Sequence, residues 1–202
     1  RGFNALLRDM YLNPSFVDKL MDRITEYNLK LAKLLAEHNI DIFYLGDDYG
    51  AQDRLLISPD FWRRFIKPRL RKVVRIPRRR GLPVFLHSDG NISSIIPDLV
   101  EIGITILNPI QPLSVDPTWV KERFGDKLCL DGTLDIQRTM PFGQPEDVKR
   151  EVIKRLMTVA QGGGLILSYH STLPEVPINN LVTLVNTIRK YRRYPIKDGD
   201  GF

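Results

Sequence analysis

The segment His87-Ser88-Asp89-Gly90 follows a short apolar run and places an imidazole two positions before a carboxylate. Side chains two residues apart on extended chain point the same way. His87 and Asp89 can therefore hold one divalent metal ion, since both groups are ordinary ligands of zinc and also suit non-haem iron. His170, after a later apolar run, is the natural third ligand. The alternative is a metal-free pair in which Asp89 orients or charges His87.

Two adjacent carboxylates, Asp47 and Asp48, end another apolar run. Neighbouring residues cannot share one face of a strand, so we expect separate roles for them. One contacts substrate or assists proton transfer, and the other caps the turn or pairs with Gln52 or Arg54. A plain turn with a solvated acid is the alternative. We count both carboxylates as candidate catalytic residues.

Asp131, at the end of a further run, is the third candidate catalytic residue, and it alternates with Cys129. Cys129 is better explained as a buried structural thiol than as a nucleophile. The amide residues Asn108 and Gln111 flank Pro109-Ile110, which we expect to form a stiff turn. The two amides either bind a substrate carboxylate or amide, or simply help to form that turn. The predicted substrate-binding residues are Tyr49, Gln52, Asn108 and Gln111.

These polar residues follow short, continuous apolar runs that alternate with helix-like stretches. We predict strands at 40–45, 83–86, 103–107, 127–130 and 165–167, and helices at 14–38, 58–77, 91–102, 116–124, 144–160 and 178–191. Pro68 and Pro77 are expected to interrupt or end the second helix. An apolar stripe from Phe16 to Leu35 has the helical period and is expected to face a core.

Strands that alternate with helices predict right-handed βαβ units and a parallel α/β sheet whose polar ends open onto one face. Continuous apolar strands indicate burial on both faces. Five units cannot close an eight-stranded barrel, so either the sheet is open or three units precede Arg1. The helix from Pro14 has no preceding strand, which favours missing units. We predict one domain spanning residues 1–202.

Composition is that of an ordinary globular protein, with 43% hydrophobic and 27% charged residues. No apolar run approaches the ~20 residues that span a membrane, and no signal segment opens the chain, which favours the cytoplasm. A single cysteine excludes a disulfide framework and a multi-cysteine zinc cluster within the chain.

The net charge of +6 is concentrated in residues 63–80, which carry ten lysines and arginines. A solvated helix face explains this stretch most simply, and contact with an acidic partner or subunit is the alternative. Nucleic-acid binding is disfavoured because the basic residues are not interleaved with stacking aromatic residues and match no known module.

Taken together, the motifs resemble the uroporphyrinogen decarboxylase superfamily over nearly the whole chain. The segments that carry the resemblance are Gly46–Gln52 with Ile57-Ser58-Pro59, Lys67-Pro68-Arg69, His87–Gly90, Leu107–Pro112, Gly162-Gly163-Gly164, His170, Val176-Pro177 and Asn180. The resemblance implies a (β/α)8 TIM barrel with its site at the carboxyl ends of the strands. It also implies that this chain corresponds to about the last five βα units.

Two chemistries occur in this superfamily. Decarboxylases act on uroporphyrinogen, in porphyrin biosynthesis, without a cofactor, whereas corrinoid-linked methyltransferases use zinc to activate a thiol or another methyl acceptor. The methyltransferase zinc site resembles His-x-Cys plus a later Cys, and the matching positions here are His87, Asp89 and His170. Replacing both thiolates should make the metal a stronger Lewis acid.

The resemblance therefore favours a zinc-dependent methyltransferase that acts with a corrinoid protein. The alternatives are a cofactor-free uroporphyrinogen decarboxylase, in which His170 contacts substrate, and a truncated or non-catalytic binding subunit. We expect a small-molecule substrate, no nucleic acid and no membrane. A homo-oligomer is one way to cover an open sheet edge.

Overall fold

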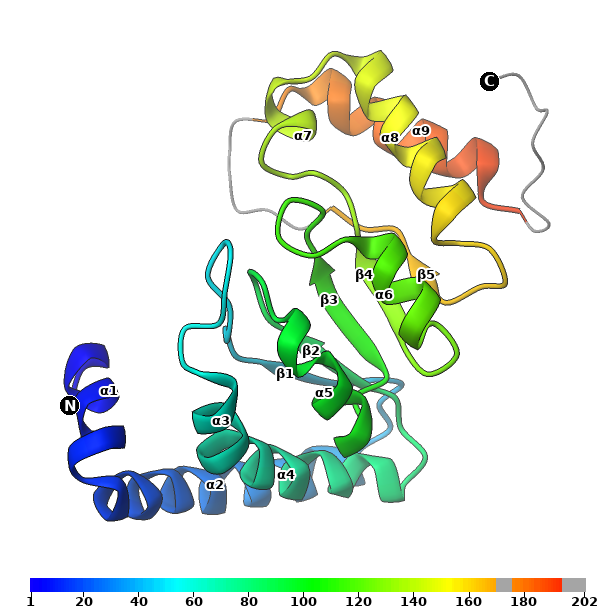
Figure 1. Cartoon of the computed structure of the whole chain (residues 1–202). Helices are drawn as coiled ribbons and strands as arrows, with labels where there is room; N and C mark the ends of the chain where they lie inside the picture. Colours follow the sequence, from blue (N-terminus) through cyan, green and yellow to red (C-terminus); the bar gives the residue numbers. More distant parts are fainter. Residues whose placement is uncertain (170–175, 194–202) are drawn as a thin grey trace. The chain divides into compact units, whose positions relative to one another are not determined.

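The computed structural model describes residues 1–169 and 176–193. The chain divides into two compact units, Arg1–Ile106 and Leu107–Phe202. Figure 1 traces both along the chain.

The first unit is built on two parallel strands and the helices that flank them in sequence. Its elements are α1 (Phe3–Leu12), α2 (Pro14–Glu37), β1 (Phe43–Gly46), α3 (Pro59–Phe61), the π-helix η1 (Trp62–Ile66), α4 (Lys67–Arg79), β2 (Val84–His87), the short 3₁₀ turn η2 (Ser93–Ile95) and α5 (Ile96–Ile102). Strands β1 and β2 pair in parallel, with Phe43 opposite Val84 and Gly46 opposite His87. That register brings the polar residues after both strands to one edge.

The helical stretch after Ser58 consists of three segments, and its two prolines lie near the ends of the last one. The Ser58 hydroxyl accepts a hydrogen bond from the Phe61 N–H and caps the stretch. Pro68 lies in the first turn of α4, directly after η1, where its missing N–H needs no partner. Pro77 lies inside α4 but close to its end at Arg79. The expectation is therefore borne out in part: a π-helix interrupts the α-helical stretch directly before Pro68, and α4 ends two residues after Pro77.

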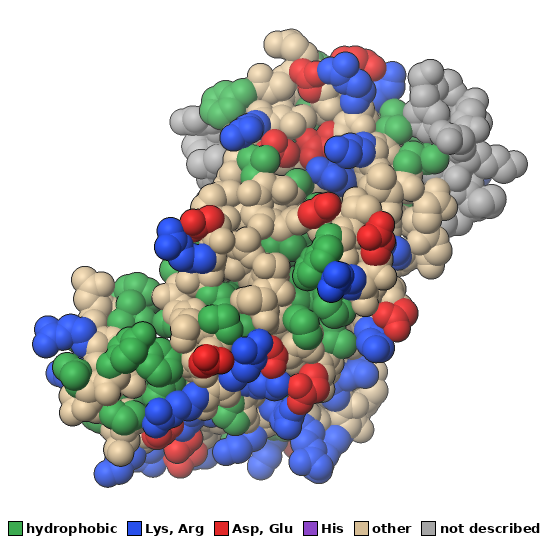
Figure 2. Space-filling view, viewed as in Figure 1, with side chains coloured by type: hydrophobic (Ala, Val, Ile, Leu, Met, Phe, Trp, Pro, Cys, Tyr) green, Lys and Arg blue, Asp and Glu red, His purple; other side chains and the backbone are tan. Residues whose placement is uncertain are grey.

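The apolar stripe predicted on α2 faces outward in this chain. The helix buries its small-residue side, including Val17, Ala32 and Ala36, and it packs on α4. Tyr27 of the predicted stripe is 68% exposed. Figure 2 shows hydrophobic side chains at the surface near the N-terminal helices. The helical period therefore identified the apolar face of α2 correctly, but it did not show that the small-residue face is the buried one.

Charged side chains join α4 to its neighbours in the first unit. Arg69 bonds Asp18 and Asp22 of α2. Lys67 contacts Asp98 of α5 at 2.6 Å, and Arg63 contacts the same carboxylate at 3.1 Å. Burial by itself would raise the pKa of Asp98, but these two cations outweigh it and hold the pKa below its usual value. Part of the basic stretch therefore serves to pack helices.

The second unit contains the later strands and a pair of long helices. Its elements are β3 (Ile106–Ile110), which starts at the boundary, α6 (Pro117–Phe124), β4 (Cys129–Gly132), α7 (Thr139–Phe142), α8 (Pro145–Thr158), β5 (Leu165–Ile166) and α9 (Ile178–Tyr191). Strands β4 and β5 pair in parallel. Helices α8 and α9 pack together around a buried cluster that includes Val152, Leu156 and Leu184.

Side chains cap the starts of α6 and α8 in the second unit. Asp116 accepts a hydrogen bond from the Thr118 N–H at the start of α6. At the start of α8, the Gln144 N–H donates to the Asp147 carboxylate. The turn predicted around Pro109 is wrong, because Asn108 and Pro109 belong to β3 and their peptide bond is cis.

Strands pair in parallel within each unit, β1 with β2 in the first and β4 with β5 in the second, and strands alternate with helices along the chain. The predicted parallel α/β class is confirmed. The prediction of a single domain over residues 1–202 stays a prediction. Among the helices of the described residues, none is both long and apolar enough to cross a bilayer.

Candidate metal centre at the ends of β1 and β2

Three side chains of the first unit converge beyond the carboxyl ends of β1 and β2. Each of Asp48, His87 and Asp89 offers a ligand atom, and these atoms all lie within 4.8 Å of one another. His87 Nε2 is 3.7 Å from Asp48 Oδ1 and 3.7 Å from Asp89 Oδ2. The His87 side chain is 15% exposed, whereas those of Asp48 and Asp89 are 56% and 43% exposed. The group is therefore anchored on one side and open to solvent on the other.

Parallel pairing explains why residues about forty positions apart meet here. The Asp47 N–H donates to the His87 carbonyl at 3.1 Å, which continues the ladder beyond Gly46. Asp48 follows immediately, and its Oδ1 accepts from the Asp89 N–H at 2.9 Å. His87 and Asp89 point to the same side, as alternation along an extended chain predicts.

The donor set and spacing fit a divalent metal ion. Ligands about 2.1 Å from a tetrahedral metal lie about 3.4 Å from one another. The two 3.7 Å separations around His87 are close to that value. One imidazole and two carboxylates suit zinc and also iron(II) or manganese(II), so the ligand set does not select one metal.

Asp48, which the sequence indicates only as a candidate catalytic residue, lies beside the predicted ligands His87 and Asp89. The register of β1 against β2 determines this position of Asp48, and a single sequence does not reveal that register. His170, the predicted third ligand, lies outside the described residues, so its role stays a prediction.

Asp47 has different neighbours from Asp48. Its carboxylate hydrogen-bonds the Tyr49 side chain, and both residues line a cavity of about 260 Å³ against α2 and α4. Although part of the Asp47 side chain is open to solvent, surrounding protein atoms raise the pKa of its carboxyl. The charge of Asp48 adds to this rise, and the bond from Tyr49 opposes it.

Tyr49 is buried and its ring meets that of Trp62 edge to face, 5.6 Å between centroids. Burial raises the pKa of the Tyr49 phenol well above its ordinary value, and the nearby Asp47 raises it further. These contacts are typical of a core residue. Arg54, a suggested partner of the two aspartates, pairs with Asp53 at 3.0 Å instead. Substrate binding by Tyr49 and Gln52 stays a prediction.

A second polar cluster lies within the second unit. The Asp131 carboxylate accepts hydrogen bonds from Asn108 Nδ2 at 2.6 Å and from the Ser168 hydroxyl. Asp131, Asn108 and Gln111 are all buried. Burial, together with the charge of Asp131, raises the pKa of the Cys129 thiol, which agrees with a structural thiol rather than a nucleophile. Catalysis by Asp131 and substrate binding by Asn108 and Gln111 stay predictions.

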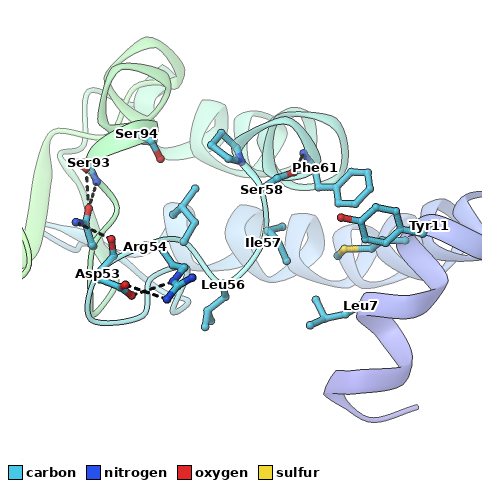
Figure 3. Close-up of a pocket in the computed structure, with 14 residues that line it drawn as sticks. Leu7, Tyr11, Asp53, Arg54, Leu56, Ile57, Ser58, Phe61, Ser93 and Ser94 are labelled. Carbon is cyan, nitrogen blue, oxygen red and sulfur yellow. Dashed lines mark hydrogen bonds and ion pairs between the residues drawn. The ribbon is translucent and has the colours of Figure 1, made fainter.

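The first unit also has a larger hollow, of about 560 Å³, between α1 and the loop that follows β1. Figure 3 shows apolar side chains such as Tyr11 and Phe61 at one end, and Asp53, Ser93 and Ser94 at the other. None of the three converging ligand residues lines this hollow. It is therefore a separate feature from the metal centre.

Comparison with known proteins places this geometry in a family. Residues 1–191 match the family described as Uroporphyrinogen decarboxylase (URO-D). The chain is 24% identical over 190 residues to a methylated-thiol–coenzyme M methyltransferase of Methanosarcina mazei, covering 94% of this chain and 48% of that protein. It is 25% identical over 191 residues to a uroporphyrinogen decarboxylase of Syntrophotalea carbinolica, covering 94% of this chain and 53% of that protein.

Solved structures show the same fold. A methyltransferase from Methanosarcina mazei superposes with a TM-score of 0.76 at 22% identity, over 94% of this chain and 54% of that one. The chain thus spans about half the length of the relatives it matches, in agreement with the predicted partial barrel. Because the family match extends over nearly all of its residues, the chain belongs to the uroporphyrinogen decarboxylase family, whose members are enzymes.

Proposed function

We propose that this chain forms the metal-binding part of a methyltransferase that exchanges a methyl group with a corrinoid protein. The observation that carries the proposal is the convergence of Asp48, His87 and Asp89. Decarboxylation of a porphyrinogen in this family needs no cofactor, whereas methyl transfer uses a metal. A preformed group of three ligand side chains favours the second chemistry.

In this proposal His87, Asp89 and Asp48 hold zinc, and His170 is a further ligand. The bound metal would supply Lewis-acid activation of the methyl acceptor. The chain's own residues fix and expose that position: His87 is mostly enclosed, and the two carboxylates keep a side open to solvent through which a substrate can approach.

The other polar residues keep, each within its own unit, the roles that the sequence predicts for them. Asp47 and Gln52, in the loop after β1, contact substrate. In the second unit, Asn108 and Gln111 bind the polar part of the substrate, and Asp131 takes part in proton transfer, held by Asn108 and Ser168.

Relatives on the methyl-transfer side support a corrinoid partner. The chain is 25% identical over 176 residues to the methylcobamide:CoM methyltransferase MtaA of Methanosarcina barkeri. It is also 23% identical over 189 residues to a second methylcobamide:CoM methyltransferase, from Methanosarcina acetivorans. Both names specify a corrinoid as methyl donor, and a cytoplasmic setting fits that chemistry.

The similarity to uroporphyrinogen decarboxylases keeps cofactor-free decarboxylation as the second candidate. The proposed methyltransferase requires a metal and the decarboxylase does not. Assays on one preparation of the purified protein therefore distinguish the two functions. Elemental analysis of the purified protein should give about one zinc per chain. The protein should also transfer the methyl group of methylcobalamin to an added thiol. Metal-free protein that decarboxylates uroporphyrinogen would establish the second candidate instead.

A matched pair of variants makes the metal assay specific. Asp89→Asn removes a proposed ligand, whereas Asp53→Asn changes an exposed carboxylate of the neighbouring loop that pairs only with Arg54 among the contacts described. Zinc content should fall in the first variant and persist in the second. Equal zinc in both would count against the proposed site.

A further inference from the structure

The loops after β1 and β2 touch backbone to backbone at two glycines. A Cβ on Gly50 would lie 2.6 Å from the Asp89 carbonyl oxygen and 2.7 Å from the Asn91 nitrogen. A Cβ on Gly90 would lie 2.5 Å from the Ala51 carbonyl oxygen. Gly90 also has φ +80°, in the left-handed region that favours glycine. Neither position has room for a side chain.

Several hydrogen bonds connect the same two loops, and three of them are 3.0 Å or shorter. The Tyr49 N–H donates to the buried Ser88 hydroxyl at 3.0 Å. The Asn91 N–H donates to the Ala51 carbonyl at 2.7 Å. The third runs from the Asp89 N–H to the Asp48 carboxylate. The bonds from Tyr49 and Asn91 hold the two loops together. The bond from Asp89 also orients the side chain of Asp48, a proposed metal ligand.

This contact places the two carboxylates from different loops beside one imidazole. Asp48 is more than half exposed, so little side-chain packing holds it in place. Its position depends on the path of its loop and on the Asp89 N–H. Separating the loops by the width of a methyl group would move Asp48 away from Asp89 and His87 together.

We propose that Gly50, Gly90 and Ser88 are positioning residues of the metal centre: they let the loops interlock and so assemble Asp48 with His87 and Asp89 before metal arrives. The inference rests on the proposed function, because it assumes that the group binds metal. Such supporting groups typically contribute 10–100-fold to metal affinity. None of the three needs to touch the metal.

The test compares glycines that differ in what surrounds them, and Gly90 and the control also share a left-handed backbone. Gly50→Ala and Gly90→Ala push the loops apart, whereas Gly81→Ala is the control, since Gly81 has φ +75° but nothing within 4 Å of its added Cβ. Ser88→Ala removes one tie without adding bulk, so it serves if either glycine variant fails to fold. Zinc and cobalt(II) affinities are measured by titration, and the melting temperature of each metal-free variant is recorded.

We expect zinc affinity to fall about 10–100-fold in both loop-glycine variants, less in Ser88→Ala, and not in Gly81→Ala. The cobalt(II) absorption spectrum at saturation should also change in the loop variants, because Asp48 leaves the ligand set. A purely structural role would lower the melting temperature without altering that spectrum. Wild-type spectra and affinities in folded Gly50→Ala, or in Ser88→Ala, would overturn the positioning role while leaving the metal centre intact. A wild-type protein that binds no metal would overturn the proposed function and this inference together.

Discussion

The carboxylates at the strand ends differ between the two units in exposure and in neighbours. In the first unit, Asp48 and Asp89 are about half exposed and lie beside an imidazole. In the second unit, Asp131 is buried, and an amide and a hydroxyl donate to it. A carboxylate supplied with protein donors has its hydrogen-bonding needs met internally. The pair in the first unit lies beside an imidazole and is reachable from solvent, which is why we propose the metal in that unit.

The largest expected effect tests that assignment directly. His87→Ala should lower zinc affinity at least 100-fold, since it removes the one nitrogen ligand of the described group. Asp131→Asn should leave zinc affinity unchanged. Inductively coupled plasma analysis and a competition titration measure both. The comparison between the units breaks if Asp131→Asn loses zinc as His87→Ala does.

The long helices of the two units are alike in leaving apolar side chains exposed. Helix α2 packs on α4 and α9 packs on α8, yet Tyr27 and Leu31 of α2 and Val182 and Val185 of α9 remain exposed. We predict that residues 1–202, expressed alone, associate rather than remain a stable monomer. Sedimentation of this segment tests the prediction, and Tyr27→Ser with Leu31→Ser should raise the monomer fraction. A cooperatively melting wild-type monomer would contradict it.

A smaller effect should appear in the stability of the second unit. Asp131→Ala leaves the Asn108 amide and the Ser168 hydroxyl without their shared acceptor, which should lower the free energy of unfolding by about 1–3 kcal/mol. Asp48→Ala, which removes an exposed carboxylate, should cost less than that in the absence of metal. Urea titrations of both metal-free variants give the ranking, and a reversed order would undo the distinction between buried and open carboxylates.

The smallest effect concerns acid stability in the first unit. The pKa of Asp98 is lowered from 3.8, so its ionised form stabilises the fold above that pH. This contribution should fade as pH falls below 3.8 and through the folded-state pKa. Asp98→Asn should flatten the pH dependence of the unfolding free energy in that range. Acid titrations of wild type and variant measure the unfolding free energy against pH. Identical slopes would show that the ion pairs of Asp98 with Lys67 and Arg63 do not contribute to stability in this range.

Short-range patterns predicted much of this protein. Ser58 and Asp116 cap helices as their types indicate, because a capping bond joins residues two or three positions apart. His87 and Asp89 share one side because alternation on extended chain is a local property. The alternation of strands with helices likewise predicted the parallel α/β class, since such connections admit few topologies.

What the tertiary structure decided depends on contacts between distant segments. Asp48 joins His87 only through the register of β1 against β2, and Gly50 matters only because Gly90 lies against it. The outward face of α2 depends on which side α4 occupies, and periodicity is the same for either choice. Residue type and local spacing were thus enough to identify the chemical groups, but pairing between strands determined which of them meet.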